Sequence, residues 1–171
     1  LKTEGLVVLD VASGKTVAMQ EWKTRFSTNA TTPMVMGDKI FISTGYSRGC
    51  GLYEFTGDAF KEIYSNKAIS NHMANCVLIE GHLYGITGNT HGISKKQLVC
   101  MKLDTGEVKW KEQGFGCGTV SAAGNKLVVL TERGELVVSR ASPGGFDALS
   151  RAQVNTGRCW TVPVLANGVI Y

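Results

Sequence analysis

The sequence predicts an all-β protein, and three observations carry this prediction. A short apolar run, a two-residue turn and a second apolar run occur four times, starting at Pro33, Cys76, Val120 and Pro163. These starts lie 43, 44 and 43 residues apart. The 171 residues include 21 Gly but only 3 Pro, which suits many tight hairpins between short strands. A period of about 40–45 residues filled with short strands is typical of a β-propeller, with one four-stranded antiparallel blade per repeat.

The four hairpins are expected to supply the first and second strands of each blade. Every turn contains a residue that tolerates positive φ, as primed hairpin turns require. The turn pairs are Gly37-Asp38, Glu80-Gly81, Gly124-Asn125 and Asn167-Gly168.

The third and fourth strands follow each hairpin after a loop. Third strands are predicted over residues 5–9, 51–55, 97–103 and 134–140, and fourth strands over 16–22, 60–64, 108–111 and 148–154. Large apolar residues alternate with charged ones in Val108-Lys109-Trp110-Lys111, which favours a strand over a helix. No segment shows a 3.6-residue apolar stripe behind an N-cap residue.

This register predicts a single partial β-propeller over residues 1–171, containing about four blades' worth of chain. Residues 28–70, 71–114 and 115–157 are expected to form complete blades, with half-blades at 1–27 and 158–171. We expect a segment of a longer propeller. In the alternative, the two half-blades complete each other within one chain to give four blades. Between two chains, the same pairing through open blade edges gives an eight-bladed ring.

Composition describes an ordinary globular protein, with 43% hydrophobic and 19% charged residues. The aliphatic runs are strand-sized, so no membrane span is expected. The net charge of +4 is scattered, and Lys95-Lys96 is the single basic doublet, so nothing argues for nucleic acid as a partner. The odd number of Cys residues, without C-x-x-C spacing, predicts buried small side chains and no zinc site.

Two turns between third and fourth strands carry a recognisable phrase. One contains Asp10 and Gly14 with Trp22 downstream, and the other contains Asp104, Gly106 and Trp110. Asp and Ser or Thr side chains close such a turn, Gly takes positive φ, and Trp docks against a neighbouring blade. The phrase resembles the repeat of the bacterial pyrroloquinoline-quinone (PQQ)-like propellers of the quinoprotein dehydrogenase-like superfamily.

The resemblance implies a complete ring of six to eight blades and a periplasmic or otherwise extracytoplasmic location. It does not imply a cofactor: the dehydrogenases of this superfamily use adjacent cysteines beside the quinone, with calcium, and no two cysteines here are adjacent. We therefore favour a non-catalytic binding or scaffolding platform without cofactor, whose partner is a protein or small molecule at a propeller face. The alternatives are part of a PQQ-dependent dehydrogenase, holding PQQ and calcium, and a propeller that binds a small ligand or sugar.

A ligand on a propeller usually lies at the mouth of the central channel, where loops lead into the innermost strands. His72 is the most interesting mouth residue, and Asn29, Asn75, Arg158 and Trp160 are expected to surround it as ligand contacts. Alternatively, His72 anchors loop backbone. The three His residues lack metal-site spacing, and no catalytic residue is assigned. Equivalent mouth positions four residues before the innermost strands are Asn29, His72, Gly116 and Cys159.

Overall fold

The computed structural model describes residues 1–171 and contains sixteen β-strands and no helix, which confirms the all-β propeller class. No element is therefore a helix able to cross a membrane. A two-stranded sheet of β1 (Gly5–Leu9) and β2 (Thr16–Glu21) comes first in the chain. The last sheet also has two strands, β15 (Leu165–Ala166) and β16 (Val169–Ile170).

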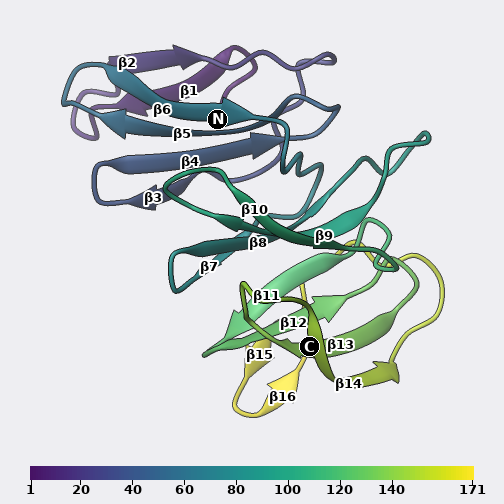
Figure 1. Ribbon diagram of the computed structural model, residues 1–171. Helices are drawn as coiled ribbons and strands as arrows, with labels where there is room; N and C mark the ends of the chain where they lie inside the picture. The colour runs from purple at the N-terminus through teal and green to yellow at the C-terminus, as the bar shows by residue number, and fades with distance from the viewer.

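Between them lie three antiparallel four-stranded sheets, each with its strands in chain order. The first contains β3 (Met34–Met36), β4 (Lys39–Thr44), β5 (Gly49–Phe55) and β6 (Phe60–Asn66). The second contains β7 (Val77–Ile79), β8 (His82–Thr87), β9 (Gln97–Lys102) and β10 (Val108–Glu112). The third contains β11 (Thr119–Ala123), β12 (Lys126–Leu130), β13 (Glu135–Arg140) and β14 (Asp147–Gln153). The sheets follow one another down the molecule (Figure 1).

Strand limits differ from the sequence prediction by one or two residues. β5 begins at Gly49 rather than residue 51, because Gly49 still pairs with Thr44. β6 continues to Asn66 rather than residue 64, because Asn66 pairs with Cys50. Apolar alternation does not detect these polar and glycine positions, which are held by backbone pairing. The exact blade limits, at residues 28, 71, 115 and 158, stay a prediction.

The hydrophobic core lies between the sheets, because the central strands bury both of their faces. In β4, Ile40 and Ile42 pack toward Leu6 and Trp22 of the preceding sheet, whereas Phe41 packs toward Leu83 of the following one. In β9, alternate residues likewise belong to the two core clusters on either side of the sheet. Successive side chains of a strand point to opposite faces of the sheet. A sheet that is covered on both faces therefore needs consecutive apolar residues in its central strands. All five Cys residues are buried, as expected, and none forms a disulfide.

Tryptophans link consecutive sheets. Trp22, directly after β2, is completely buried, and its Nε1–H donates to Thr44 Oγ1 of β4 at 2.8 Å. The Arg48 guanidinium lies 3.6 Å from the centroid of the Trp22 ring. Trp110 in β10 donates from Nε1 to the Ser142 carbonyl of the next sheet at 2.7 Å. Trp22 is thus buried and Trp110 half-buried, and each indole N–H finds its acceptor across a sheet boundary.

The antiparallel order sorts the connections onto two faces of the molecule. The crossover face comprises the segments 22–33, 45–48, 67–76, 88–96, 113–118, 131–134 and 154–164. The hairpin face comprises the segments 10–15, 37–38, 56–59, 80–81, 103–107, 124–125, 141–146 and 167–168. In Figure 1 the crossover face is on the right, where the loop between β8 and β9 projects, and the hairpin face is on the left.

The two turns of the PQQ-like phrase lie on the hairpin face, where the first is closed by its own side chains and the second contacts the preceding sheet. Asp10 Oδ1 accepts from the backbone N–H and the hydroxyl of Ser13, at 2.8 and 2.6 Å. Asp104 forms an ion pair of 2.9 Å with Lys39 of the preceding sheet. The Gly106 carbonyl accepts from Asn66 Nδ2 at 3.3 Å, so this turn touches the neighbouring sheet directly.

Gly106 and Gly14 provide a matched pair for testing that contact. Their φ angles are +69° and +68°, but a Cβ at Gly106 would lie 2.5 Å from Asn66 Nδ2 and 2.9 Å from Tyr64 Cε2. A Cβ at Gly14 would meet nothing within 4 Å. Gly14→Ala should cost about 1–2 kcal/mol in the free energy of unfolding, from the left-handed backbone alone. Gly106→Ala should cost about 1–3 kcal/mol more through overpacking, measured by denaturant titration. Equal losses would show that the turn does not pack on its neighbour.

Candidate functional site

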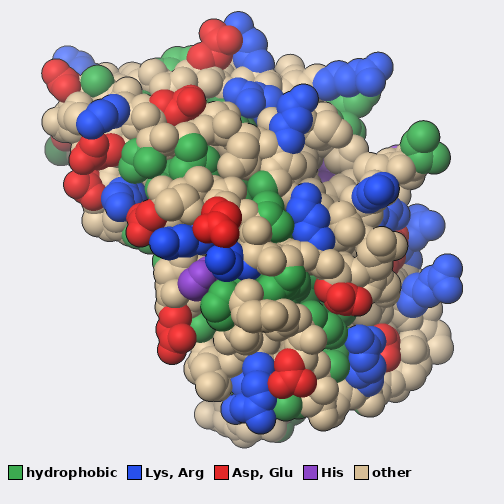
Figure 2. Space-filling view, in the orientation of Figure 1, with side chains coloured by type: hydrophobic (Ala, Val, Ile, Leu, Met, Phe, Trp, Pro, Cys, Tyr) green, Lys and Arg blue, Asp and Glu red, His purple; other side chains and the backbone are tan.

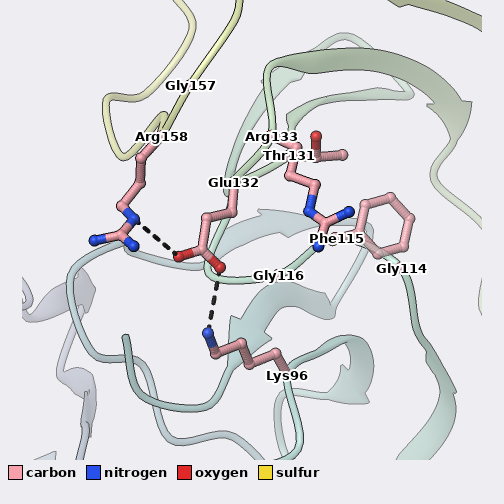
Figure 3. Close-up of a pocket in the computed structure, with 9 residues that line it drawn as sticks. All are labelled: Lys96, Gly114, Phe115, Gly116, Thr131, Glu132, Arg133, Gly157 and Arg158. Atoms are coloured by element: carbon pink, nitrogen blue, oxygen red, sulfur yellow. Dashed lines mark hydrogen bonds and ion pairs between the residues drawn. The ribbon is translucent and has the colours of Figure 1, made fainter. Parts of the chain in front are cut away.

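A cavity of about 750 Å³ opens on the crossover face. Four connecting segments line it, and they come from the second and third four-stranded sheets and from the chain leading to β15. Figure 3 shows Glu132 at its centre with Lys96 and Arg158 on either side. The lining residues are Lys96, Gly114, Phe115, Gly116, Thr131, Glu132, Arg133, Gly157 and Arg158.

The Glu132 carboxylate holds three of these segments together. Its Oε2 accepts from the Cys117 backbone N–H at 3.0 Å and lies 3.3 Å from Lys96 Nζ. Its Oε1 accepts from Trp160 Nε1–H at 3.3 Å and lies 3.9 Å from Arg158 Nε. With 17% of its side chain exposed, Glu132 is bonded on both oxygens, as a largely buried charge requires.

Backbone geometry makes room for this carboxylate. Gly116 has φ +60°, and a Cβ there would lie 2.6 Å from Glu132 Cβ. The Glu132 backbone N–H donates to the Phe115 carbonyl at 2.9 Å, and the Glu132 carbonyl accepts from the Cys159 N–H at 2.9 Å. The side chain is therefore positioned by both neighbouring crossover segments.

The charge balance of the cavity favours an anionic ligand. Burial acts to raise the pKa of Glu132, but the Cys117 N–H, Lys96 and Trp160 outweigh it, so the pKa lies below its usual range. The ionised Glu132 offsets one of three cations, and Arg133 forms no ion pair. A net positive, partly enclosed site attracts and orients carboxylates or other anions.

Of the predicted mouth residues, Gly116 and Arg158 line this cavity, and Trp160 and Cys159 donate hydrogen bonds to Glu132. The Arg158 guanidinium lies 5.2 Å from the centroid of the Trp160 ring, above the indole that donates to Glu132. Arg158 and Trp160 thus contact Glu132, whereas the sequence predicts them around His72.

Asn29 and Asn75 are used by the loops themselves. Asn29 Nδ2 donates to the Lys2 and Trp22 carbonyls at 2.6 and 3.3 Å, fastening the first sheet to its crossover segment. Asn75 Oδ1 accepts from the Thr32 N–H at 2.9 Å, joining two successive crossover segments. Both side chains therefore fix the relative positions of the loops.

His72 is held within a column of rings and loop backbone. Its ring meets the Tyr46 ring edge-on at a centroid distance of 4.8 Å, and Tyr46 meets Phe26 in the same way at 4.9 Å. His72 Nδ1 accepts from the Thr90 backbone N–H at 3.2 Å. Burial, and secondarily His91, lowers the pKa of His72, which favours the neutral ring that this bond needs.

Comparison with known proteins identifies the family. The model of the family described as outer membrane protein assembly factor BamB matches residues 2–112. The chain belongs to this family. No curated protein matches it.

Two solved structures share the fold of this BamB-family chain. BamB from Moraxella catarrhalis is 17% identical, with a TM-score of 0.69 over 96% of this chain and 47% of that one. The computationally designed Ika8 protein is 10% identical, with a TM-score of 0.71 over 99% of this chain and 49% of that one. The chain thus spans about half the length of each, and at these identities the likeness shows the fold alone.

Sequence reasoning missed Glu132 and Lys96 in this BamB-family chain, although the repeat held a signal. In the three four-stranded sheets a Thr stands at the end of the second strand: Thr44 and Thr87 are the last residues of β4 and β8, and Thr131 directly follows β12. The next residue is Gly in the first two repeats, Gly45 and Gly88, and Glu132 in the third. A carboxylate at a position that is Gly in the other two repeats indicates that the turn of the third repeat binds neighbouring segments through this side chain.

Replacing Glu132 tests its role as a clasp. Glu132→Ala should lower the free energy of unfolding by about 1–3 kcal/mol at neutral pH, because buried donors lose their acceptor. A depressed carboxyl pKa gives stability that is present above the ordinary value of 4.5 and lost as pH falls below it. Thermal melts of Glu132→Gln should therefore show a smaller loss between pH 5 and pH 3 than the native chain. Parallel curves would contradict the clasp.

Replacing His72 tests loop anchoring against ligand contact. His72→Ala should lower the free energy of unfolding by about 1–3 kcal/mol through loss of the ring packing and the Thr90 bond. Because the pKa of His72 is lowered, its contribution is present above the ordinary value of 6.5 and lost as pH falls. The protection of the Thr90 amide from hydrogen exchange should fall over that range. An unchanged melting temperature in His72→Ala would favour the ligand-contact alternative.

Proposed function

We propose that this BamB-family chain is a non-catalytic platform that binds a protein partner on its crossover face. The observation that carries the proposal is the Glu132 cavity, a fixed positive recess built from four separate connections. Asn29, Asn75 and His72 hold the surrounding loops to one another. On this face, polar side chains fix the positions of the loops, and cations remain able to pair with a ligand. Such a preorganised face suits recognition of another molecule.

The proposal extends to assembly of outer-membrane proteins and to a periplasmic or outer-membrane-associated location. Both follow from the description of the matched family as an outer membrane protein assembly factor. A scaffold in such an assembly needs a rigid surface and defined contacts, and stacked sheets joined by the buried Trp22 and the half-buried Trp110 supply the rigidity.

The competing dehydrogenase proposal requires a site for PQQ and calcium. The five Cys side chains are buried and free, and no three His, Cys, Asp or Glu side chains converge. Titration with PQQ and Ca²⁺, followed by quinone absorbance, tests this directly. We expect no saturable binding at micromolar quinone, and stoichiometric tight binding would overturn the platform proposal.

Site-specific photocrosslinking in the cell envelope tests the platform itself. The photoreactive residue replaces Phe26 on the crossover face, and a second variant carries it at Val11 on the hairpin face as a control. Both positions are accessible, because Phe26 is 62% exposed and Val11 is fully exposed. We expect a defined protein adduct from position 26 that mass spectrometry identifies as an envelope assembly protein, and none from position 11. Adducts from both positions alike, or from neither, would contradict the proposal.

A further inference from the structure

The connecting segments of the two faces differ in charge, although the strand ends beside them are mixed: Lys39, Lys126 and Arg140 border hairpin turns, and Glu21 and Glu112 border crossover segments. The segments of the crossover face contain eight Lys and Arg residues and one carboxylate, Glu132. The segments of the hairpin face contain one cation, Lys15, and six carboxylates. In Figure 2 several blue side chains project along the right edge, whereas blue and red side chains are intermixed toward the left. The six carboxylates are Asp10, Asp38, Asp58, Glu80, Asp104 and Glu107.

Most of the crossover cations form no ion pair within the chain, although Arg48 packs on the Trp22 ring and donates to the Lys23 carbonyl. Lys23 pairs with Glu21 at the end of β2, and Lys96 and Arg158 share Glu132. Glu135, at the start of β13, is paired with Arg151. The remaining five form no ion pair: Arg25, Arg48, Lys67, Lys95 and Arg133.

We propose that the crossover face binds an acidic polypeptide segment, one of whose carboxylates enters the Glu132 cavity among Lys96, Arg133 and Arg158. This rests on the proposed function and specifies the chemistry of its partner. Opposite charge speeds encounter and selects among partners, and paired Arg side chains suit carboxylates in particular. The cavity of about 750 Å³ is large enough for several side chains of a bound segment.

The recess favours a polypeptide over an anionic lipid surface. Within the cavity, 25% of the Lys96 side chain is exposed, so a flat layer of headgroups passes over it whereas an inserted side chain reaches it. Exposed apolar side chains stand on the surrounding loops, with exposed fractions of 62% for Phe26 and 49% for Met73. A segment that carries both acidic and apolar residues matches both features.

A binding assay with a defined probe tests the proposal. The probe is a fluorescein-labelled peptide of repeated Glu-Ser-Leu triplets, compared by anisotropy with its Gln-Ser-Leu counterpart at low ionic strength. We expect the Glu peptide to bind and to weaken steeply with added salt, and the Gln peptide to bind at least about tenfold more weakly. Equal binding of both peptides would overturn the proposal.

Matched variants locate the binding face. Lys95→Gln with Arg133→Gln removes two exposed, unpaired cations and should weaken Glu-peptide binding about three- to tenfold. Lys15→Gln with Lys126→Gln changes the net charge equally on the opposite side and should leave binding within about twofold. An equal loss in both double variants would mean diffuse attraction only, against a defined site.

Glu132→Gln gives a response of the opposite sign. Removing the carboxylate from the cavity should tighten Glu-peptide binding about two- to fivefold, because it removes repulsion and releases Lys96 and Arg158. Loss of binding in this variant would contradict entry of a carboxylate there. Binding to phosphatidylglycerol vesicles without binding of the Glu peptide would assign the face to lipid. Failure with the peptide, together with a protein adduct at position 26, would leave the platform intact and reject acidic recognition alone.

Discussion

The structure depends on one constraint, which is that the central strands of each sheet are apolar on both faces. In β4, Ile40 and Ile42 pack against the preceding sheet, and Phe41 packs against the following one. A sheet of this kind exposes a hydrophobic face unless another sheet covers it, so the sheets stabilise one another in sequence. The position of every connecting loop then follows from the stacking. Contacts such as Trp22 with Thr44 and Trp110 with Ser142 fix the registration between sheets.

Local chemistry made the sheets predictable from the sequence, because a hairpin is specified by a few adjacent residues. Glu80 and Asn167 adopt the positive φ that their two-residue turns require, and Asp10 and Asp104 lie in turns that the sequence also predicts. The candidate site was less predictable, because it joins loops from different repeats. Arg158 and Trp160 were placed at the channel mouth from their register, but their partner is Glu132 of the preceding repeat, not His72. Which loops meet depends on the angle between sheets, and no short pattern encodes that angle.

Turn chemistry also explains why the carboxylates collect on one face. Asp side chains accept hydrogen bonds from the backbone two or three residues on, so tight turns between strands select them. Asp10 does this with Ser13. The crossover segments are longer and are fastened instead by amides such as Asn29 and Asn75. Nothing in their folding requires Lys67, Lys95 or Arg133, whose side chains form no hydrogen bond or ion pair. These exposed cations are therefore available to the acidic partner that we propose.

Glu132 stands where the demands of folding and of binding oppose each other. As a carboxylate on a basic face it weakens the attraction for an anionic partner, yet it accepts donors from three connecting segments. Without it, Lys96 and Arg158 would repel each other across a partly enclosed space, and the Cys117 N–H would lose its acceptor. A bound carboxylate can take over part of this neutralisation, because Lys96 and Arg158 each have hydrogen-bonding capacity left beyond Glu132. Glu132 thus fixes the loops that line the cavity and determines how much positive charge the cavity presents to a ligand.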